Sequence, residues 1–239
     1  MTALRHLDVA LLPVELSEVD AECYLVIDVL RATTTIAVLL ARGAAEVRVV
    51  SSIPEARAFA EGAVLAGEER GFRPQGFDLG NSPTEAAAAA IEGKRVVMAT
   101  TNGTHALLAA AGRGTVIAAS LVNLSAAAAA AAAYRRVAIV CAGTHRGSRF
   151  AVEDFATAAL YVARLAGEAS HLELGDGALL AAQLARAADA PAMVRSAAHA
   201  RYLAAAGFGP DIEYALRIDS WPVVPHVAAS GAGWAALRL

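Results

Sequence analysis

Residues 26–38 read VIDVLRATTTIAV and place an acid, a base and a run of threonines between two apolar stretches. The acid is Asp28 and the base is Arg31. A guanidinium can bind a phosphate through two parallel hydrogen bonds, and a carboxylate can bind a hard cation. The stretch therefore predicts an anion site at a strand-to-helix junction. A structural ion pair of Arg31 with Asp28 or Glu22 would also explain the arginine.

Small hydroxyl, amide and glycine residues follow two other predicted strands. In the stretches MATTNGTHAL and IVCAGTHRG they are Thr101, Asn102, Gly103, Thr104, Gly143 and Thr144. Free backbone N–H groups and the helix dipole favour an anion at a helix N-terminus. For any single stretch, plain helix capping is an alternative. Because the carboxyl ends of sheet strands meet in one crevice, three such stretches together favour an anion-binding cleft.

Acidic residues near such a cleft could hold a cation. Glu153 and Asp154 begin a predicted helix, where they could also simply complement the helix dipole. Together with Asp28, either of them could bind Mg²⁺ and leave positions for water and phosphate oxygens. Glu68 is a further candidate ligand, in the Gly- and Pro-rich segment 66–83. A long ordered loop of this kind is usually functional.

Other chemistries have weaker support. Cys141 ends a strand like a thiolate nucleophile, but Arg146 falls one residue short of a C-x5-R loop, and a buried cysteine is usually a small apolar residue. The histidines lack the spacing of a zinc site, although His105 or His145 could act as a general acid. A haloacid-dehalogenase-type phosphatase would need D-x-D, and position 30 is Leu30.

The elements that must position these residues alternate along the chain. Short β-branched runs predict strands at 24–29, 46–50, 95–99, 115–119 and 136–141. Alanine-rich runs predict helices at 35–42, 53–61, 84–91, 103–110, 125–134, 152–165, 177–188 and 192–206. The C-terminal tail holds one more candidate strand. The pattern predicts a layered α/β fold with a mixed, mostly parallel sheet flanked by alanine-rich helices.

Length and composition limit the classes of protein. We expect the 239 residues to form a single domain, and leave open two subdomains with the site between them. A net charge of −3 without charged blocks argues against nucleic acid and membrane surfaces as partners. Two cysteines outside a C-x-x-C pair and an N-terminus without a signal-peptide layout predict a cytoplasmic protein without a membrane span. Whether the chain forms a homo-oligomer stays open.

Five motifs resemble one known family. The stretches DVLRATTTI, GFDLGNSPTE, TTNGTHAL, CAGT followed by VEDF, and AAGFGPDIEYALRID are similar, in this order, to the 2-phosphosulfolactate phosphatase (ComB-like) family. The resemblance implies that family's own α/β fold and a Mg²⁺-dependent phosphatase that acts on (2R)-2-phospho-3-sulfolactate on the route to coenzyme M. Two positions depart from the family pattern. His105 stands where a larger basic residue is usual, and Ala200 stands where glycine follows His199.

We therefore expect a phosphatase for 2-phosphosulfolactate or a related small, anionic 2-phospho-hydroxyacid. The alternative is a non-catalytic protein that binds a phosphorylated or sulfonated metabolite. The expected catalytic residues are Asp28, Arg31 and Asp154, and the expected Mg²⁺ ligands are Asp28, Glu68, Glu153 and Asp154. The expected substrate-binding residues are Arg31, Thr33, Thr34, Asn81, Ser82, Thr101, Asn102, Gly103, Thr104, Gly143 and Thr144.

Overall fold

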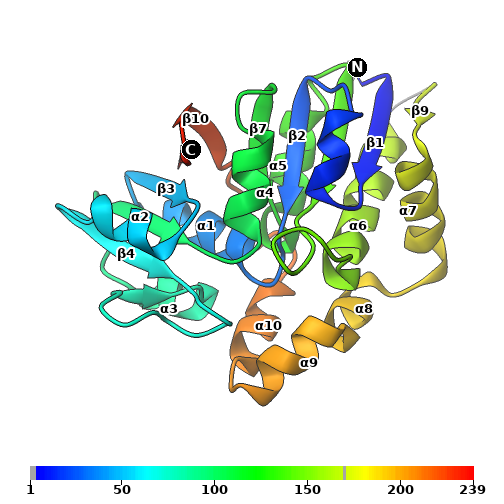
Figure 1. Cartoon of the computed structure of the whole chain (residues 1–239). Helices are drawn as coiled ribbons and strands as arrows, with labels where there is room; N and C mark the ends of the chain where they lie inside the picture. Colours follow the sequence, from blue (N-terminus) through cyan, green and yellow to red (C-terminus); the bar gives the residue numbers. More distant parts are fainter. Residues whose placement is uncertain (1–3, 169–170) are drawn as a thin grey trace.

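The computed structural model describes residues 4–168 and 171–239, in which eleven strands form one sheet flanked by helices (Figure 1). The strands are β1 (His6–Ala10), β2 (Cys23–Ile27), β3 (Glu46–Val50), β4 (Ala63–Gly67), β5 (Leu79–Gly80), β6 (Arg95–Ala99), β7 (Thr115–Ala119), β8 (Arg136–Cys141), β9 (Glu173–Leu174), β10 (His226–Gly231) and β11 (Trp234–Arg238). The predicted α/β class with a mixed, mostly parallel sheet is confirmed.

The helices lie between the strands in sequence. They are α1 (Ala32–Ala41), α2 (Ile53–Ala58), α3 (Pro83–Ala88), α4 (Gly103–Ala110), α5 (Leu124–Ala131), α6 (Val152–Glu168), α7 (Asp176–Ala187), α8 (Ala190–Ser196), α9 (Ala198–Ala205) and α10 (Gly209–Ala215). The alanine tract forms α5, which packs Ala127, Ala128 and Ala131 into the core. Within the described residues, no helix is long and apolar enough to cross a membrane.

The sheet consists of two parallel groups of strands joined by a hairpin. The strand order is β5-β4-β6-β3-β11-β10-β7-β2-β8-β1-β9, and β10–β11 is the antiparallel hairpin in the middle. β10 has a register shift between Val227 and Ala229, and it pairs with β7 through His226 and Ile117. An irregularity of this kind bends and twists a strand. The two groups accordingly run in different directions in Figure 1.

Helices cover both faces of the central strands, so the sheet has an apolar cluster on each side. In β2, Leu25 and Ile27 belong to an apolar cluster with α5 and α6, whereas Tyr24 and Val26 belong to a second cluster with α1 and α4. Successive side chains of a strand point to opposite faces, so a strand that is covered on both sides is apolar throughout. The first polar residue after β2 is therefore at its carboxyl end, where Asp28 lies.

Most predicted elements are present, but α10 and the two-residue strands β5 and β9 were not predicted, and there are three further differences. β1 and β4 lie in segments for which we predicted no strand; β1 contains Asp8 and β4 has few β-branched residues. The C-terminal tail forms two strands, β10 and β11, where we expected one. The single helix predicted at 192–206 is wrong: α8 and α9 are separated at Ala197, whose ψ of 152° is extended. Alanine favours a helix on both sides of this break, so helix propensity does not explain it.

Candidate active site

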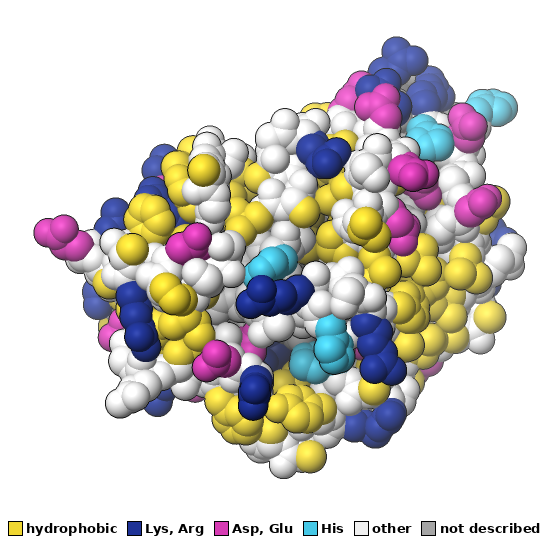
Figure 2. Space-filling view, in the orientation of Figure 1, with side chains coloured by type: hydrophobic (Ala, Val, Ile, Leu, Met, Phe, Trp, Pro, Cys, Tyr) yellow, Lys and Arg dark blue, Asp and Glu magenta, His cyan; other side chains and the backbone are white. Residues whose placement is uncertain are grey.

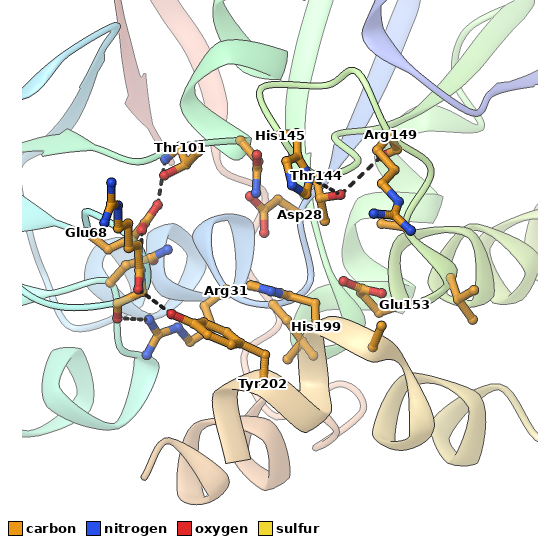
Figure 3. Close-up of a pocket in the computed structure, with 18 of the residues that line it drawn as sticks. Asp28, Arg31, Glu68, Thr101, Thr144, His145, Arg149, Glu153, His199 and Tyr202 are labelled. Atoms are coloured by element: carbon orange, nitrogen blue, oxygen red, sulfur yellow. Dashed lines mark hydrogen bonds between the residues drawn. The ribbon is translucent and has the colours of Figure 1, made fainter. Parts of the chain in front are cut away.

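A cavity of about 720 Å³ opens at the carboxyl ends of strands from both parallel groups (Figure 3). Its walls come from the β2–α1 junction, the segment between β4 and α3, the β6–α4 junction, the β8–α6 loop and α9. Figure 2 shows basic and histidine side chains around a hollow on this face of the molecule. Polar residues that are far apart in sequence thus meet in one cleft, as the three polar strand ends predicted.

Asp28 follows β2 and lines the cavity. Its Oδ1 accepts a hydrogen bond of 3.2 Å from the Ala32 N–H, at the start of α1. Burial raises the pKa of Asp28 to about 7, and the negative charges of Glu68 and Glu153 add to this shift, although the Ala32 and Gly103 N–H groups oppose it. A carboxyl group with a pKa near neutrality can accept and release a proton under ordinary conditions.

Of the two neighbouring acids on α6, only one reaches the cavity. Glu153 lines it, and burial raises the pKa of this carboxyl. Asp154 is not among the lining residues; its oxygens accept hydrogen bonds of 3.0 Å each from the Val29 and Gly143 N–H groups. Burial, and then the charges of Asp28 and Glu153, raise the pKa of Asp154 well above its ordinary value. Asp154 therefore joins the ends of β2 and β8 from behind the cavity.

Glu68 lines the cavity and holds two of its walls together. Its Oε1 accepts a hydrogen bond of 2.6 Å from the Thr101 N–H, and its Oε2 accepts one of 2.7 Å from the Gly71 N–H. The segment 66–83 is ordered and contributes Glu68, Arg70 and Asn81 to the cavity. The segment thus lies at the cavity, and its functional role stays a prediction.

Arg31 lines the cavity but is anchored on two sides of its guanidinium group. Nη1 forms an ion pair of 2.8 Å with Asp211, and Nη2 donates a hydrogen bond of 2.7 Å to the Gly71 carbonyl. The Phe208 ring centroid lies 4.2 Å from Cζ. Arg31 thus forms a structural ion pair, as one interpretation of the sequence expected. Its partner is Asp211 on α10, however, and neither Asp28 nor Glu22. A guanidinium has five N–H donors, so these contacts leave others for a ligand.

The threonines divide into two groups. Thr33, Thr34 and Thr104 are fully buried and do not line the cavity. Their hydroxyls donate to backbone carbonyls four or five residues earlier in the chain, at 2.8–2.9 Å. They stabilise the strand-to-helix junctions, so the structure does not place them to contact a substrate. Thr101 and Thr144 do line the cavity.

The two glycines expected at the site allow close packing and do not themselves line the cavity. A Cβ on Gly103 would lie 2.5 Å from the Ala32 Cβ and 2.6 Å from Asp28 Oδ2, so only glycine allows α4 to begin here. Gly143 has a φ of +66°, and its N–H donates to Asp154. Asn102 does line the cavity, and its Oδ1 accepts from the Arg146 N–H at 3.0 Å.

Asn81 and Ser82 have different surroundings. Asn81 lines the cavity, and its buried Oδ1 has no hydrogen-bond partner in the described chain. Ser82 caps α3, because its Oγ accepts the Glu85 N–H at 3.2 Å, and it donates to Asp211 Oδ1 at 2.7 Å. The structure therefore brings Asn81 to the site and assigns Ser82 to its support.

Among the polar and charged side chains that line the cavity, four were not predicted: Arg70, Arg149, His199 and Tyr202. Tyr202 donates a hydrogen bond of 2.8 Å to the Arg70 carbonyl, which brings α9 against the segment after β4. Burial and the charge of Arg31 lower the pKa of His199. Polar residues in an alanine-rich helix resemble an ordinary solvent face, so no sequence signal separated Tyr202 from surface residues. His199 belongs to a family motif, but the sequence did not indicate that it faces the site.

The remaining candidate residues have clear positions. His145 lines the cavity, and its Nδ1 is 3.2 Å from Thr144 Oγ1, whereas His105 is not among the lining residues. Cys141 is fully buried, and burial raises the pKa of its thiol well above its ordinary value. A thiol in this state is a poor nucleophile. Among the candidate general acids, His145 is therefore the one at the site.

The donor set of the cavity fits Mg²⁺. Mg²⁺ is usually held by one or two carboxylates together with waters and substrate phosphates. Asp28 and Glu153 supply two buried carboxylates, and Asn81 supplies a buried carbonyl oxygen without a partner in the described chain. Within residues 4–168 and 171–239, no three His, Cys, Asp or Glu side chains form a metal-binding group. The four carboxylates expected as ligands therefore do not form one group among the described residues, and the two buried ones that line the cavity with Asn81, Asp28 and Glu153, are the number that Mg²⁺ usually uses.

Comparison with known proteins agrees with the motifs. A family model described as 2-phosphosulpholactate phosphatase matches residues 11–230. A probable 2-phosphosulfolactate phosphatase of Carboxydothermus hydrogenoformans is 39% identical over 92% of this chain and 92% of its own. One of Thermus thermophilus is 42% identical over 84% and 86%. Because the matches extend along nearly the whole chain, it belongs to the 2-phosphosulfolactate phosphatase family of phosphoric monoester hydrolases.

Proposed function

We propose that this protein is a Mg²⁺-dependent phosphatase that hydrolyses 2-phosphosulfolactate, or a related 2-phospho-hydroxyacid, to the hydroxyacid and phosphate. The observation that carries the proposal is that two buried carboxylates, Asp28 and Glu153, line the same cavity as the buried guanidinium of Arg31. Acids beside an anion-binding group need a cation to balance the charges, and the relatives with this sequence pattern are named as probable 2-phosphosulfolactate phosphatases.

The chain's own residues supply most of what phosphoryl transfer requires. Arg31 binds phosphoryl oxygens, and Thr101, Asn102 and Thr144 surround the same anion with hydroxyl and amide groups. Bound Mg²⁺ would neutralise charge on those oxygens. Either Asp28 would help to hold the cation while a water molecule attacks phosphorus, or Asp28 itself attacks and water then hydrolyses the aspartyl phosphate. In each case, the bond from phosphorus to the ester oxygen breaks as the first new P–O bond forms. His145 donates the proton that the leaving oxygen takes up.

A preference for substrates with a second anionic group has its own support. Arg70 and Arg149 also line the cavity, and within the described residues neither guanidinium forms an ion pair. Unpaired cations beside the phosphate position would bind a carboxylate or sulfonate of the same molecule. The route to coenzyme M and the cytoplasmic location stay predictions from sequence.

The test is phosphate release from a panel of phosphate monoesters, each assayed with Mg²⁺ and with a chelator. We expect release that depends on Mg²⁺ and is fastest for 2-phospho-hydroxyacids that carry a carboxylate or sulfonate. Phenyl phosphate, which has no second anion, serves as the matched substrate and should be turned over more slowly. Absence of release from every ester would contradict the proposal and favour a protein that only binds such anions.

A further inference from the structure

A buried network on α10 surrounds the side chain of Arg31. Asp211 is 2% exposed, and its Oδ2 lies 2.8 Å from Arg31 Nη1. Its Oδ1 accepts hydrogen bonds from Ser82 Oγ at 2.7 Å and from Thr84 Oγ1 at 2.5 Å. One carboxylate thus joins α10, the start of α1 and the start of α3, and none of the chemistry assigned above uses it.

The network restricts the guanidinium in three ways. Asp211 holds Nη1, the Gly71 carbonyl holds Nη2, and the Phe208 ring lies against the planar group at 4.2 Å. An arginine has a long side chain with many rotamers, and binding an anion with a free one costs conformational entropy. A guanidinium that is already fixed avoids this cost and keeps its remaining donors in one orientation.

The same carboxylate also supports a second cavity residue. Asn81 precedes Ser82, and its Oδ1 is buried without a partner in the described chain. Because Ser82 and Thr84 both donate to Asp211, the backbone that carries Asn81 is tied to the carboxylate that holds Arg31. Two ligand-facing groups from distant parts of the sequence therefore depend on one acid.

We propose that Asp211 is a positioning residue for phosphate binding: it holds the Arg31 guanidinium, and the turn at Asn81, in the arrangement that receives the phosphoryl group. This inference rests on the proposed function in one respect, namely that Arg31 binds phosphate. Asp211 itself does not line the cavity and touches no reacting atom. It acts through Arg31.

The test is a double-mutant cycle of Asp211→Asn and Arg31→Ala, read by calorimetric binding of inorganic phosphate in the presence of Mg²⁺. The asparagine keeps the volume of the side chain and removes its charge. We expect Asp211→Asn to weaken phosphate binding by about 10–100-fold, by analogy with the effect of removing residues that orient metal ligands. In the Arg31→Ala background, Asp211→Asn should weaken phosphate binding further by less than about twofold, because its effect is transmitted through the guanidinium.

Glu213 provides the matched control. It lies on α10 as well, and it forms an ion pair of 2.8 Å with Arg195 on the surface, away from the cavity. Glu213→Gln should leave phosphate binding unchanged. If Asp211→Asn fails to fold, Thr84→Val removes one hydrogen bond to Asp211 and should weaken phosphate binding several-fold in the Arg31-containing protein only.

The outcomes separate the inference from the proposed function. If Asp211→Asn reduced phosphate affinity equally with and without Arg31, Asp211 would only stabilise the fold. This result would overturn the inference. Phosphate binding that Arg31→Ala leaves intact would also overturn it. A wild-type protein that binds phosphate but releases none from any ester would contradict the proposed catalysis, while the cycle could still confirm the role of Asp211.

Discussion

At the scale of single residues, the site depends on charges that are buried at a cost. Asp28, Glu153 and Asp154 are each at most 5% exposed, and burial is the main cause of the raised pKa of all three. A carboxylate removed from water is destabilising unless it is paired with a cation or well hydrogen-bonded. Such groups are retained where they do chemistry, which distinguishes Asp28 from the exposed acids of the surface.

Asp28→Asn should abolish activity without unfolding the protein. The amide cannot take up a proton or attack phosphorus, and it is a weaker cation ligand, so we expect kcat to fall by at least about 10³-fold. Because Asn also removes a desolvated charge, the apo protein should be as stable as the wild type or more stable at about pH 8. Steady-state assays and thermal unfolding measure the two effects.

Asp176→Asn is the control for this change. Asp176 is exposed in the first turn of α7, outside the cavity, and its substitution should leave kcat unchanged. Residual activity of Asp28→Asn close to that of the wild type would remove Asp28 from both of its proposed roles.

At the scale of elements, the site is built by junctions between strands and helices. The buried hydroxyls of Thr33 and Thr34 bond to the end of β2, and Asp154 bonds to the ends of β2 and β8. α4 reaches Asp28 because it begins with Gly103, whose N–H helps to hold the carboxylate. The helices therefore bring N–H groups to the cavity while their own side chains fix the junctions.

Gly103→Ala should destabilise the protein and reduce its activity. The added methyl group would lie 2.5 Å from the Ala32 Cβ and 2.6 Å from Asp28 Oδ2, so the start of α4 must move. Overpacking of this kind typically costs about 1–3 kcal/mol. Urea unfolding measures the loss, and the KM and kcat of the phosphatase reaction report the displacement of Asp28.

Gly167→Ala is the matched substitution. Gly167 lies in α6 with open space around its Cβ position, so alanine should raise the free energy of unfolding by about 0.5–1 kcal/mol. If both substitutions had the same effect on stability, the close approach at Gly103 would not be the cause.

At the scale of the whole molecule, the hairpin β10–β11 lies between the two parallel groups of strands whose carboxyl ends meet at the cavity. It separates the group containing β4 and β6 from the group containing β2 and β8, yet the residues after all four strands line one cavity. The acids contributed by the two groups therefore face each other. Burial and mutual repulsion make the folded state less stable when these carboxylates are charged.

Mg²⁺ should stabilise the protein more at about pH 8 than at about pH 5.5. The pKa of Asp28 is raised to about 7, so the folded state binds its proton more tightly than the unfolded chain does. Without a cation, the contribution of the Asp28 carboxyl group to stability is greatest below its unfolded pKa of about 4 and is lost as the pH rises through about 7. A cation offsets this loss only where the carboxylates are ionised.

Differential scanning calorimetry measures the effect. At a Mg²⁺ concentration one hundred times Kd, the gain should be about 2.7 kcal/mol. For a chain of this size, that corresponds to an increase in Tm of about 5–10 °C. The Asp28→Asn variant should show little of this Mg²⁺-dependent increase in Tm, and the Asp176→Asn variant should show all of it. An equal increase at both pH values would place the cation away from these acids.

The sequence alone determined the class of fold, most strands and helices, and the stretches that form the site. Four strands were predicted with their observed bounds, because buried strands and alanine-rich helices have distinct local patterns. Asp28, Arg31, Glu68, Asn81, Asn102 and Glu153 were predicted and line the cavity. Most of these follow an apolar strand, lie in an irregular loop or begin a helix, which local patterns indicate, whereas Asn81 was expected from the family resemblance.

Only the tertiary structure decided which polar groups face the cavity. Sequence spacing cannot separate Glu153, which lines it, from Asp154, which bonds to backbone N–H groups behind it. Nor could it give Asp211 as the partner of Arg31, because the two are 180 residues apart. His199 and Tyr202 reach the site only because α9 packs across it. The direction of a side chain depends on contacts between elements, and such contacts leave no local pattern in the sequence.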